Sequence, residues 1–258
     1  MTYRQLDPEQ TIATLHTLKN RISERFPESG LAGVAGELCQ IAGESKAKIA
    51  WIDRPQFGLR LLVFLFVAAF VSLMAVGINE IVRNHQETSG VAEFVSLVEA
   101  ATNEIILCGA AILFLFSLEL RIKRTRALQV LHDLRAMAHV VDMHQLTKDP
   151  SRILNAGAEP TRSSPKRQLT PWLLSRYLDY CSELLSLVSK LAALYAQSLP
   201  DQVVVAAVND IETLTNSLSR KIWQKIVILN EGVHSGEIPL PGKPAPVTAP
   251  PSPPAAQS

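Results

Sequence analysis

Residues 61–78 read LLVFLFVAAFVSLMAVGI, and this stretch decides the fold because it contains no charged side chain. A helix of about 20 apolar residues crosses the roughly 30 Å hydrocarbon core of a bilayer. With the flanking Gly58 and Leu59 the stretch reaches that length. A soluble helix of this length normally keeps one polar face, and this stretch has none. We therefore predict a first transmembrane span at about residues 58–78.

A second apolar stretch, residues 105–118, reads IILCGAAILFLFSL. Its 14 residues are few for a span, but a basic cluster follows at once, as is typical at the headgroup level. The cluster consists of Arg121, Lys123, Arg124 and Arg126. We predict a second span at about residues 104–120 and an outer loop at residues 79–103. Residues 57–120 would then form a two-helix transmembrane hairpin.

The distribution of Lys and Arg predicts the orientation of this hairpin. Four basic residues lie in residues 46–60, five in residues 121–135, and one, Arg83, between the spans. Basic loops stay on the cytoplasmic side of a membrane. We therefore expect both chain termini in the cytoplasm and the lipid bilayer as a partner. The chain has no N-x-Ser/Thr sequon and no N-terminal signal peptide, which favours a bacterial inner membrane.

The remaining residues predict helices and no strand. Capping signals and apolar residues three and four apart place two helices in residues 1–56, the first starting at Asp7-Pro8. The same rhythm continues from the second span through residues 121–150 as one rod-like helix. Residues 171–232 carry two further apolar stripes joined at Pro200-Asp201, which predicts an antiparallel, coiled-coil-like hairpin.

Two segments are rich in residues that interrupt secondary structure. Residues 151–170 contain Ser, Pro, Gly and charged side chains and predict a linker, while the proline-rich residues 233–258 predict a disordered tail. The fold is thus expected to be an all-α membrane protein with a transmembrane hairpin and a cytoplasmic helical bundle. The hairpin of residues 171–232 cannot bury its own stripes, so other helices of the chain or a second subunit must cover it.

Four glycines, Gly30, Gly33, Gly36 and Gly43, lie in the second N-terminal helix. A phosphate-binding loop would need a following Gly-Lys-Ser/Thr and a preceding strand, and the sequence provides neither. We expect instead a helix face of small residues that packs closely on another element.

One face of the predicted rod carries the residues best suited to chemistry. His132, Arg135, His139 and Asp142 follow one another three and four residues apart, so they share a helix face. His139 and Asp142 could supply two ligands to a metal ion, but the remaining ligands would have to come from elsewhere. The same pair could do acid–base work or sense pH, yet no nucleophile accompanies it. We favour a structural or subunit-interface network.

Two ionisable residues lie at the cytoplasmic ends of the spans, Arg60 on the first and Glu119 on the second. They could form an ion pair or line the mouth of a pore, because ionisable residues of membrane segments are often functional. At the ends of spans, however, charged groups reach the interface easily, so we favour a structural role.

The composition argues against several classes of function. The formal net charge is +1, without the strongly basic face of a nucleic-acid-binding protein, so we expect no nucleic acid partner. Three scattered cysteines, Cys39, Cys108 and Cys181, fit neither a disulfide framework nor a zinc knuckle. The sequence also contains no recognisable catalytic or cofactor motif, so we expect neither an enzyme nor a cofactor.

These observations favour a non-enzymatic, oligomeric membrane anchor or scaffold, or a signal-coupling module. We expect a homo-oligomer and a cytoplasmic protein partner bound through residues 171–232. Two alternatives stay open. One is a small channel or transport subunit, and the other is a metal or pH sensor, or an enzyme, that uses the His/Asp face of residues 121–145.

Overall fold

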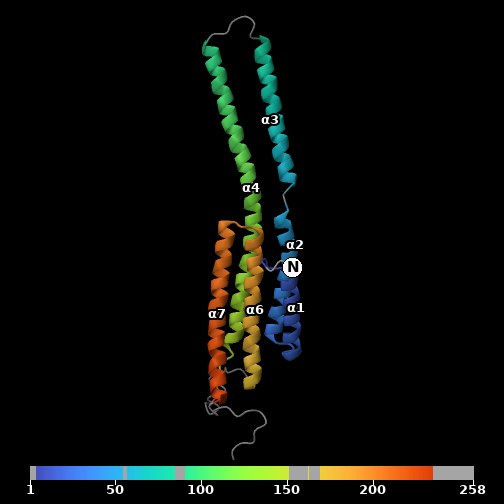
Figure 1. Ribbon diagram of the computed structural model, residues 1–258, viewed down its shortest axis with the longest axis vertical. Coiled ribbons are helices and arrows are strands. Elements are labelled where there is room, and N and C mark those ends of the chain that lie inside the picture. The colour runs from blue at the N-terminus through green and yellow to red at the C-terminus, as the bar shows by residue number, and fades with distance from the viewer. Residues whose placement is uncertain (1–3, 55–56, 85–90, 151–161, 163–168, 235–258) are drawn as a thin grey trace, which may run out of the picture. The chain divides into compact units, whose positions relative to one another are not determined.

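The fold is all-α: six helices packed as a bundle make up the described part of the chain (Figure 1). The structure is a computed structural model and describes residues 4–54, 57–84, 91–150, 162 and 169–234. The helices are α1 Pro8–Arg25, α2 Gly30–Asp53, α3 Phe57–Asn84, α4 Val91–Leu146, α6 Pro171–Ser198 and α7 Gln202–His234. The predicted all-α fold is confirmed. The linker falls almost entirely outside the described residues, as do residues 235–258 of the tail.

The helix ends follow from local chemistry. Asp7 caps α1 as predicted, because its Oδ1 accepts a hydrogen bond from the backbone N–H of Glu9, 2.8 Å away. Asp201 caps α7 in the same way, with its Oδ1 3.1 Å from the backbone nitrogen of Val203. The hairpin that we predicted over residues 171–232 extends slightly further, since α7 continues through Gly232 to His234. A glycine inside a helix costs only about 1 kcal/mol.

Five helices, α1, α2, α4, α6 and α7, supply all but two of the buried hydrophobic side chains of the described residues, and α3 supplies none of them. The two exceptions, Phe26 and Leu199, directly follow α1 and α6. The largest fully buried side chains are Tyr180, Tyr195, Leu15, Ile22, Leu31, Leu38, Leu131, Leu134, Leu178, Leu184, Leu185 and Leu191. Burial of each such leucine stabilises the fold by about 1.5–3 kcal/mol. The apolar stripes of residues 171–232 are therefore buried within this chain, without a second subunit.

The chain divides into two compact units, and most helices contribute a segment to each. The first unit comprises Met1–Ile12, Gln40–Arg135 and Lys190–Ile211, and the second comprises Ala13–Cys39, Ala136–Ser189 and Glu212–Ser258. In the first unit, the Gln197 side chain of α6 pairs with both backbone polar groups of Leu6, at 3.0 and 3.2 Å. In the second, Phe26, which directly follows α1, packs edge-on against Tyr177 and Tyr180 of α6, with ring centroids 5.3 and 6.2 Å apart.

The glycines of α2 do not form the close-packed face that we expected. A Cβ at Gly33, Gly36 or Gly43 would meet no atom within 4 Å, because none of the three belongs to the buried face of α2. Gly30 differs from them, since a Cβ there would collide with the imidazole of His144 on α4. Close packing is thus confirmed at Gly30 and wrong for the other three, and nothing in the structure explains why those three are glycine.

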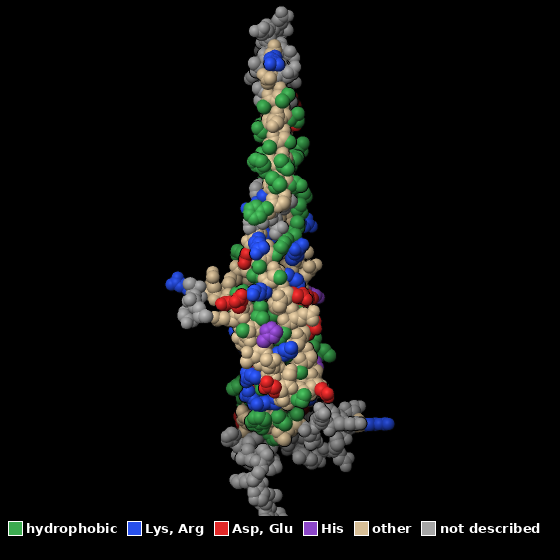
Figure 2. Space-filling view, turned by 90° about the vertical axis from the view of Figure 1, so that its right-hand side faces the viewer, with side chains coloured by type: hydrophobic (Ala, Val, Ile, Leu, Met, Phe, Trp, Pro, Cys, Tyr) green, Lys and Arg blue, Asp and Glu red, His purple; other side chains and the backbone are tan. Residues whose placement is uncertain are grey.

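α3 and the first part of α4 expose their apolar side chains (Figure 2). Their apolar stretches, Arg60–Gly77 and one within Ala101–Leu146, are long and apolar enough to cross a membrane, with mean hydropathies of 2.3 and 2.2. Neither stretch is buried inside the structure, and exposure reaches 67% at Phe64 and 72% at Leu113. The core helix of a soluble protein passes the same test of length and composition, but it would be mostly buried.

We expect Leu134→Ala to lower the free energy of unfolding by about 2–5 kcal/mol, because it removes fully buried methyl groups of α4 and leaves a cavity. The matched control is Leu146→Ala on the same helix, where the side chain is 61% exposed. It should change the free energy by less than about 0.5 kcal/mol. Thermal unfolding of the detergent-solubilised chain, followed by circular dichroism, compares the two variants. Equal effects would contradict the burial of this face of α4.

Candidate functional site

The candidate site lies in the first unit, where α4 passes from its exposed apolar stretch into the buried core. Leu120 is 42% exposed, whereas Ala127, about two helical turns further on, is fully buried. Lys and Arg side chains gather where the exposed hydrophobic side chains end (Figure 2). We call the charged side chains of this zone and their aromatic neighbour the collar. Its members are Trp51, Asp53, Arg54, Arg60, Glu119, Arg121, Lys123, Arg124, Arg126 and Asp201.

Glu119 of α4 forms ion pairs with two basic side chains of the collar. Its Oε2 lies 3.4 Å from Nε of Arg60 on α3, and its Oε1 lies 3.1 Å from Nζ of Lys123. Lys123 also donates a hydrogen bond to the backbone carbonyl of Arg54, at 3.0 Å, which ties α4 to the end of α2. The structure thus brings Arg60 and Glu119 together as an ion pair. Because the Arg60 side chain is half exposed, the pair contributes about 1 kcal/mol or less.

Arg124 of α4 holds the turn between α6 and α7. Its Nη2 lies 2.6 Å from Oδ2 of Asp201, while the other carboxylate oxygen of Asp201 caps α7. The hydrogen bond from Arg124 holds the pKa of the Asp201 carboxyl below its ordinary value, and the capped backbone N–H groups of α7 add to this effect. The capping role of Asp201 could be predicted from the sequence, but its partner, 77 residues away, could not.

Two basic side chains that α4 contributes to the collar, Arg121 and Arg126, have no carboxylate partner among the described residues. The guanidinium carbon of Arg126 lies 3.9 Å from the ring centroid of Trp51 on α2, which is a cation–π contact. Arg121 is exposed. The collar therefore contains both neutralised cations and cations that remain available to an anion.

The four residues of the predicted polar face lie along α4 and are mostly exposed. His132, Arg135 and His139 are exposed, and Asp142 is half-buried. Asp142 accepts a hydrogen bond from Nε2 of Gln145 at 2.6 Å. Among the described residues there is no group of three or more His, Cys, Asp or Glu that could hold a metal ion. The structure therefore brings no third ligand to His139 and Asp142.

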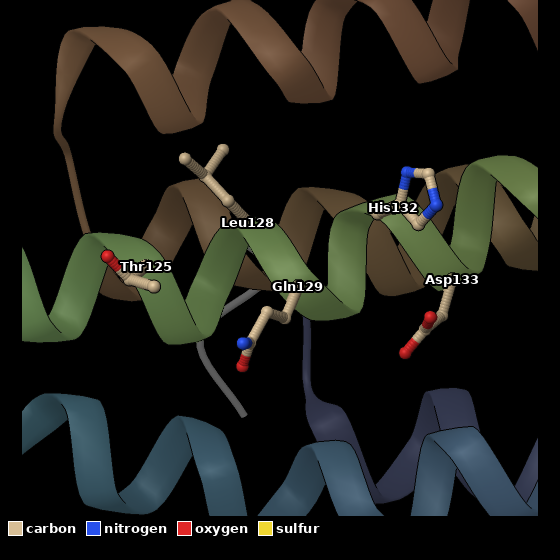
Figure 3. A pocket seen from close by; sticks show the side chains of 5 residues that line it. All are labelled: Thr125, Leu128, Gln129, His132 and Asp133. Carbon is tan, nitrogen blue, oxygen red and sulfur yellow. The ribbon is translucent and has the colours of Figure 1, made fainter.

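His132 does line a hollow of about 380 Å³ on the first unit (Figure 3). The other lining residues also belong to α4 and are Thr125, Leu128, Gln129 and Asp133. Leu128 and His132 point to one side of the helix, and Gln129 and Asp133 point to the other. All of these side chains except Leu128 are exposed. The hollow is therefore an open depression of the surface, unlike the enclosed pockets that usually hold small ligands.

A second polar centre, in the second unit, was not evident from the sequence. Lys225 of α7 donates from Nζ to Oε1 of Gln145 at 2.6 Å and to the backbone carbonyls of Gln145 and Lys148 at 3.0 and 3.4 Å. Gln145 belongs to the last turn of α4, where carbonyls lack intrahelical partners. Burial lowers the pKa of Lys225. A lysine between the buried Ile222 and Ile226 was the one signal that the sequence offered.

Tyr195 of α6 is fully buried in the first unit, and its hydroxyl has no hydrogen-bond partner among the described residues. The Ser45 hydroxyl lies beside it and donates its own proton to the backbone carbonyl of Ile41, at 2.7 Å, which leaves the Ser45 oxygen able to accept from the phenol. Burial raises the pKa of Tyr195 to about 12. The Tyr195 phenol is therefore a buried polar group that stays in its neutral form at neutral pH.

We expect Asp201→Asn to lower the free energy of unfolding by about 0.5–1.5 kcal/mol at neutral pH, because asparagine can still cap α7 but loses the charge that Arg124 pairs with. Asp201→Ala also loses the cap and should cost about 1 kcal/mol more. The control is Glu183→Gln, which removes an ion pair with Arg21 that is exposed on both sides. It should change stability by less than about 0.5 kcal/mol in the same unfolding experiment.

The pH dependence checks the same ion pair. Because the pKa of Asp201 is lower in the folded chain, its stabilising effect is fully present above the unfolded value of about 3.9 and is lost as the pH falls through the folded value. The stability difference between the natural chain and Asp201→Asn should hold steady from about pH 7 to about pH 5 and shrink below about pH 4. A difference that does not shrink would contradict the pairing.

We expect Tyr195→Phe to keep or slightly raise stability at neutral pH, because an unpartnered buried hydroxyl costs about 1–3 kcal/mol. The raised pKa predicts a further effect in alkali. The neutral phenol stabilises the fold fully below about pH 10, and this contribution is lost as the pH rises towards the folded value. The variant should therefore lose less stability than the natural chain when melting temperatures at about pH 9 and pH 11 are compared. A clear loss at neutral pH would show that the hydroxyl does have a partner.

Known proteins offer no further guide to this site. No protein-family model matches the chain, no curated protein matches it, and no solved structure matches its fold. The collar contacts and the exposure of α3 and α4 are therefore what a proposed function for this chain must stand on.

Proposed function

We propose that this protein is a non-enzymatic membrane anchor and scaffold that couples the bilayer to a cytoplasmic helical bundle. In this proposal α3 and the first part of α4 cross the membrane as a hairpin. The continuity of α4 carries the proposal, because one unbroken helix, Val91–Leu146, exposes apolar side chains in one part and buries them in another. Phe114 is exposed, for example, and Leu131 is buried.

The amount of exposed apolar surface supports a lipid environment. The large hydrophobic side chains exposed in the apolar stretches are Leu61, Leu62, Phe64, Leu65, Phe66, Val71, Leu73 and Val76 of α3 and Ile105, Ile106, Leu107, Leu113, Phe114 and Leu120 of α4. Soluble monomers rarely expose contiguous apolar patches above a few hundred Å². Transfer of such surface from water to lipid is favourable by about 25 cal/mol per Å².

The charge distribution supports an orientation with both termini in the cytoplasm, as in a bacterial inner membrane. The collar is rich in Lys and Arg, whereas Arg83 is the one basic residue between the apolar stretches. Basic flanks stay on the cytoplasmic side. The bundle, which carries most of the chain, then lies on that side too.

Contacts between α4 and α7 in each unit support a coupling role. Arg124 pairs with Asp201 in the first unit, and Gln145 is held by Lys225 in the second. A displacement of α4 within the bilayer would therefore act on α7. Within residues 171–232, α7 also exposes Trp223. In this proposal a cytoplasmic partner or a second copy of the chain binds at this exposed side chain.

Cysteine labelling with a membrane-impermeant maleimide tests the topology. We expect Arg83→Cys, near the end of α3, to be labelled from outside in spheroplasts, and Arg220→Cys, on α7, to be labelled only after permeabilisation. Both natural side chains are exposed. Background from Cys39 and Cys181 should be low, because both are buried and burial raises the pKa of both thiols.

Two outcomes would contradict the proposed anchor. Labelling of Arg220→Cys before permeabilisation would reverse or remove the hairpin, and labelling of neither position before permeabilisation would place the loop inside. Native mass spectrometry of the chain released from mild detergent adds the subunit number. A ring of several subunits, together with conductance in liposomes that changes in Glu119→Gln, would favour a channel over the scaffold.

A further inference from the structure

The height of the collar on α4 matches the headgroup layer of a bilayer, and this inference rests on the proposed membrane anchor. Arg121 and Arg126 are separated by about 7.5 Å along the helix axis, at about 1.5 Å per residue. A bilayer of about 40–45 Å with a hydrocarbon core of about 30 Å has an interfacial layer of about 5–8 Å on each side. The basic side chains of α4 therefore cover the depth at which lipid phosphates lie.

The charge of the collar is positive even after its own ion pairs are counted. Its basic side chains are Arg54, Arg60, Arg121, Lys123, Arg124 and Arg126, and its carboxylates are Asp53, Glu119 and Asp201. Glu119 and Asp201 are already engaged by cations of the collar. Among the collar residues of α4, Arg121 and Arg126 are the cations that have no carboxylate partner in the described part of the chain. An anion that reaches the collar from the membrane would meet these two side chains.

The contact between Arg126 and Trp51 prepares one of these cations for an anion. A guanidinium stacked on an indole, here at 3.9 Å, keeps its N–H groups free to donate in its own plane. Arginine in this state can bind two phosphate oxygens at once. Tryptophan is also enriched at the membrane interface, where its ring meets both apolar chains and headgroups. Trp51 thus gives the collar a fixed platform at the depth of the lipid phosphates.

We propose that the collar is a binding site for anionic phospholipid, with Arg121 and Arg126, which project about 140° apart around α4, each as a ligand of a lipid phosphate, and with Trp51 beside Arg126. The acyl chains of the same lipid would lie against the exposed apolar side chains of α3 and α4. A free phosphate ion lacks this second contact, and the headgroup of a zwitterionic lipid carries a compensating positive charge. Both should therefore bind less well than an anionic lipid.

Trp51 fluorescence reads the lipid at the collar directly. The other two tryptophans, Trp172 and Trp223, are exposed, so Trp172→Phe/Trp223→Phe should leave a folded chain with one fluorophore. This full-length chain is reconstituted in mixed vesicles of phosphatidylglycerol and phosphatidylcholine in equal amounts. Bromine is placed on the acyl chains of one lipid or of the other. We expect brominated phosphatidylglycerol to quench Trp51 several-fold more than brominated phosphatidylcholine.

Three further variants in this background assign the preference to the collar. Arg121→Gln/Arg126→Gln should abolish it, because each juxtamembrane basic residue contributes about fivefold to the binding of anionic lipid. Arg121→Lys/Arg126→Lys keeps the charges and should retain most of the preference. Arg220→Gln/Lys221→Gln removes the same charge from exposed positions on α7 and should leave it unchanged. Inorganic phosphate in the buffer should not remove the preference.

The outcomes separate this inference from the anchor on which it rests. Equal quenching by the two lipids, or an undiminished preference in Arg121→Gln/Arg126→Gln, overturns the lipid site while the anchor stands, because Trp51 is still quenched. If Arg220→Gln/Lys221→Gln also loses the preference for phosphatidylglycerol, the lipid site is overturned, because the preference then depends on net charge alone. If inorganic phosphate removes the preference, the collar binds free phosphate rather than a lipid headgroup, and the proposed lipid ligand is wrong. Quenching by neither lipid also overturns the lipid site, and the labelling of Arg83→Cys and Arg220→Cys then decides separately whether the anchor stands.

Discussion

Inside a bilayer the backbone of α4 would have no water to hydrogen-bond with, and an unbroken helix satisfies its amides and carbonyls within the chain. The same helix, Val91–Leu146, then enters the bundle, where Val130, Leu134 and Val141 are buried. In the proposed anchor, this one helix belongs to two environments, the bilayer and the bundle. The collar lies where these environments meet, and the contact with Lys225 lies at the far end of the helix. The contacts that α4 makes through Lys123, Arg124 and Gln145 therefore all belong to one continuous helix.

The ion pairs of the collar determine the orientation of α4 more than they stabilise the bundle. A half-exposed pair such as Arg60 with Glu119 contributes about 1 kcal/mol or less, whereas each buried leucine of α4 contributes about 1.5–3 kcal/mol. Apolar burial therefore determines whether the bundle forms. The polar contacts select among rotations of α4 about its axis, because one rotation brings Arg124 to Asp201 and also Lys123 to the carbonyl of Arg54.

Features that depend on neighbouring residues could be predicted from the sequence. The caps at Asp7 and Asp201 and the apolar stretches of α3 and α4 are of this kind. The contacts that build the candidate site could not be predicted, because Lys225 and Gln145 are 80 residues apart and no local pattern links them. Periodicity places His132 on a helix face but does not say what lies opposite that face.

The error at Gly33 and Gly36 has the same origin. Small side chains permit a close approach between helices, but they do not attract a neighbour, so composition alone cannot tell a packed face from an open one. The structure leaves both positions open and uses the adjacent Leu31, Val34 and Leu38 for burial. The face of α2 that carries large apolar side chains packs against the core, and the face that carries these two glycines does not.

The contacts between α4 and α7 restrict which movements of α4 could transmit a signal from the membrane in the proposed scaffold. Sliding α4 by one turn, about 5.4 Å, would separate Arg124 from Asp201 and move buried side chains such as Leu131 and Leu134 out of their packing sites. Each displaced leucine costs about 1.5–3 kcal/mol, so the sum over several residues exceeds what a few new contacts return. A movement that carries α7 along with α4 keeps these contacts. A change in the tilt or depth of the membrane hairpin would then reach the exposed face of α7 without local unfolding.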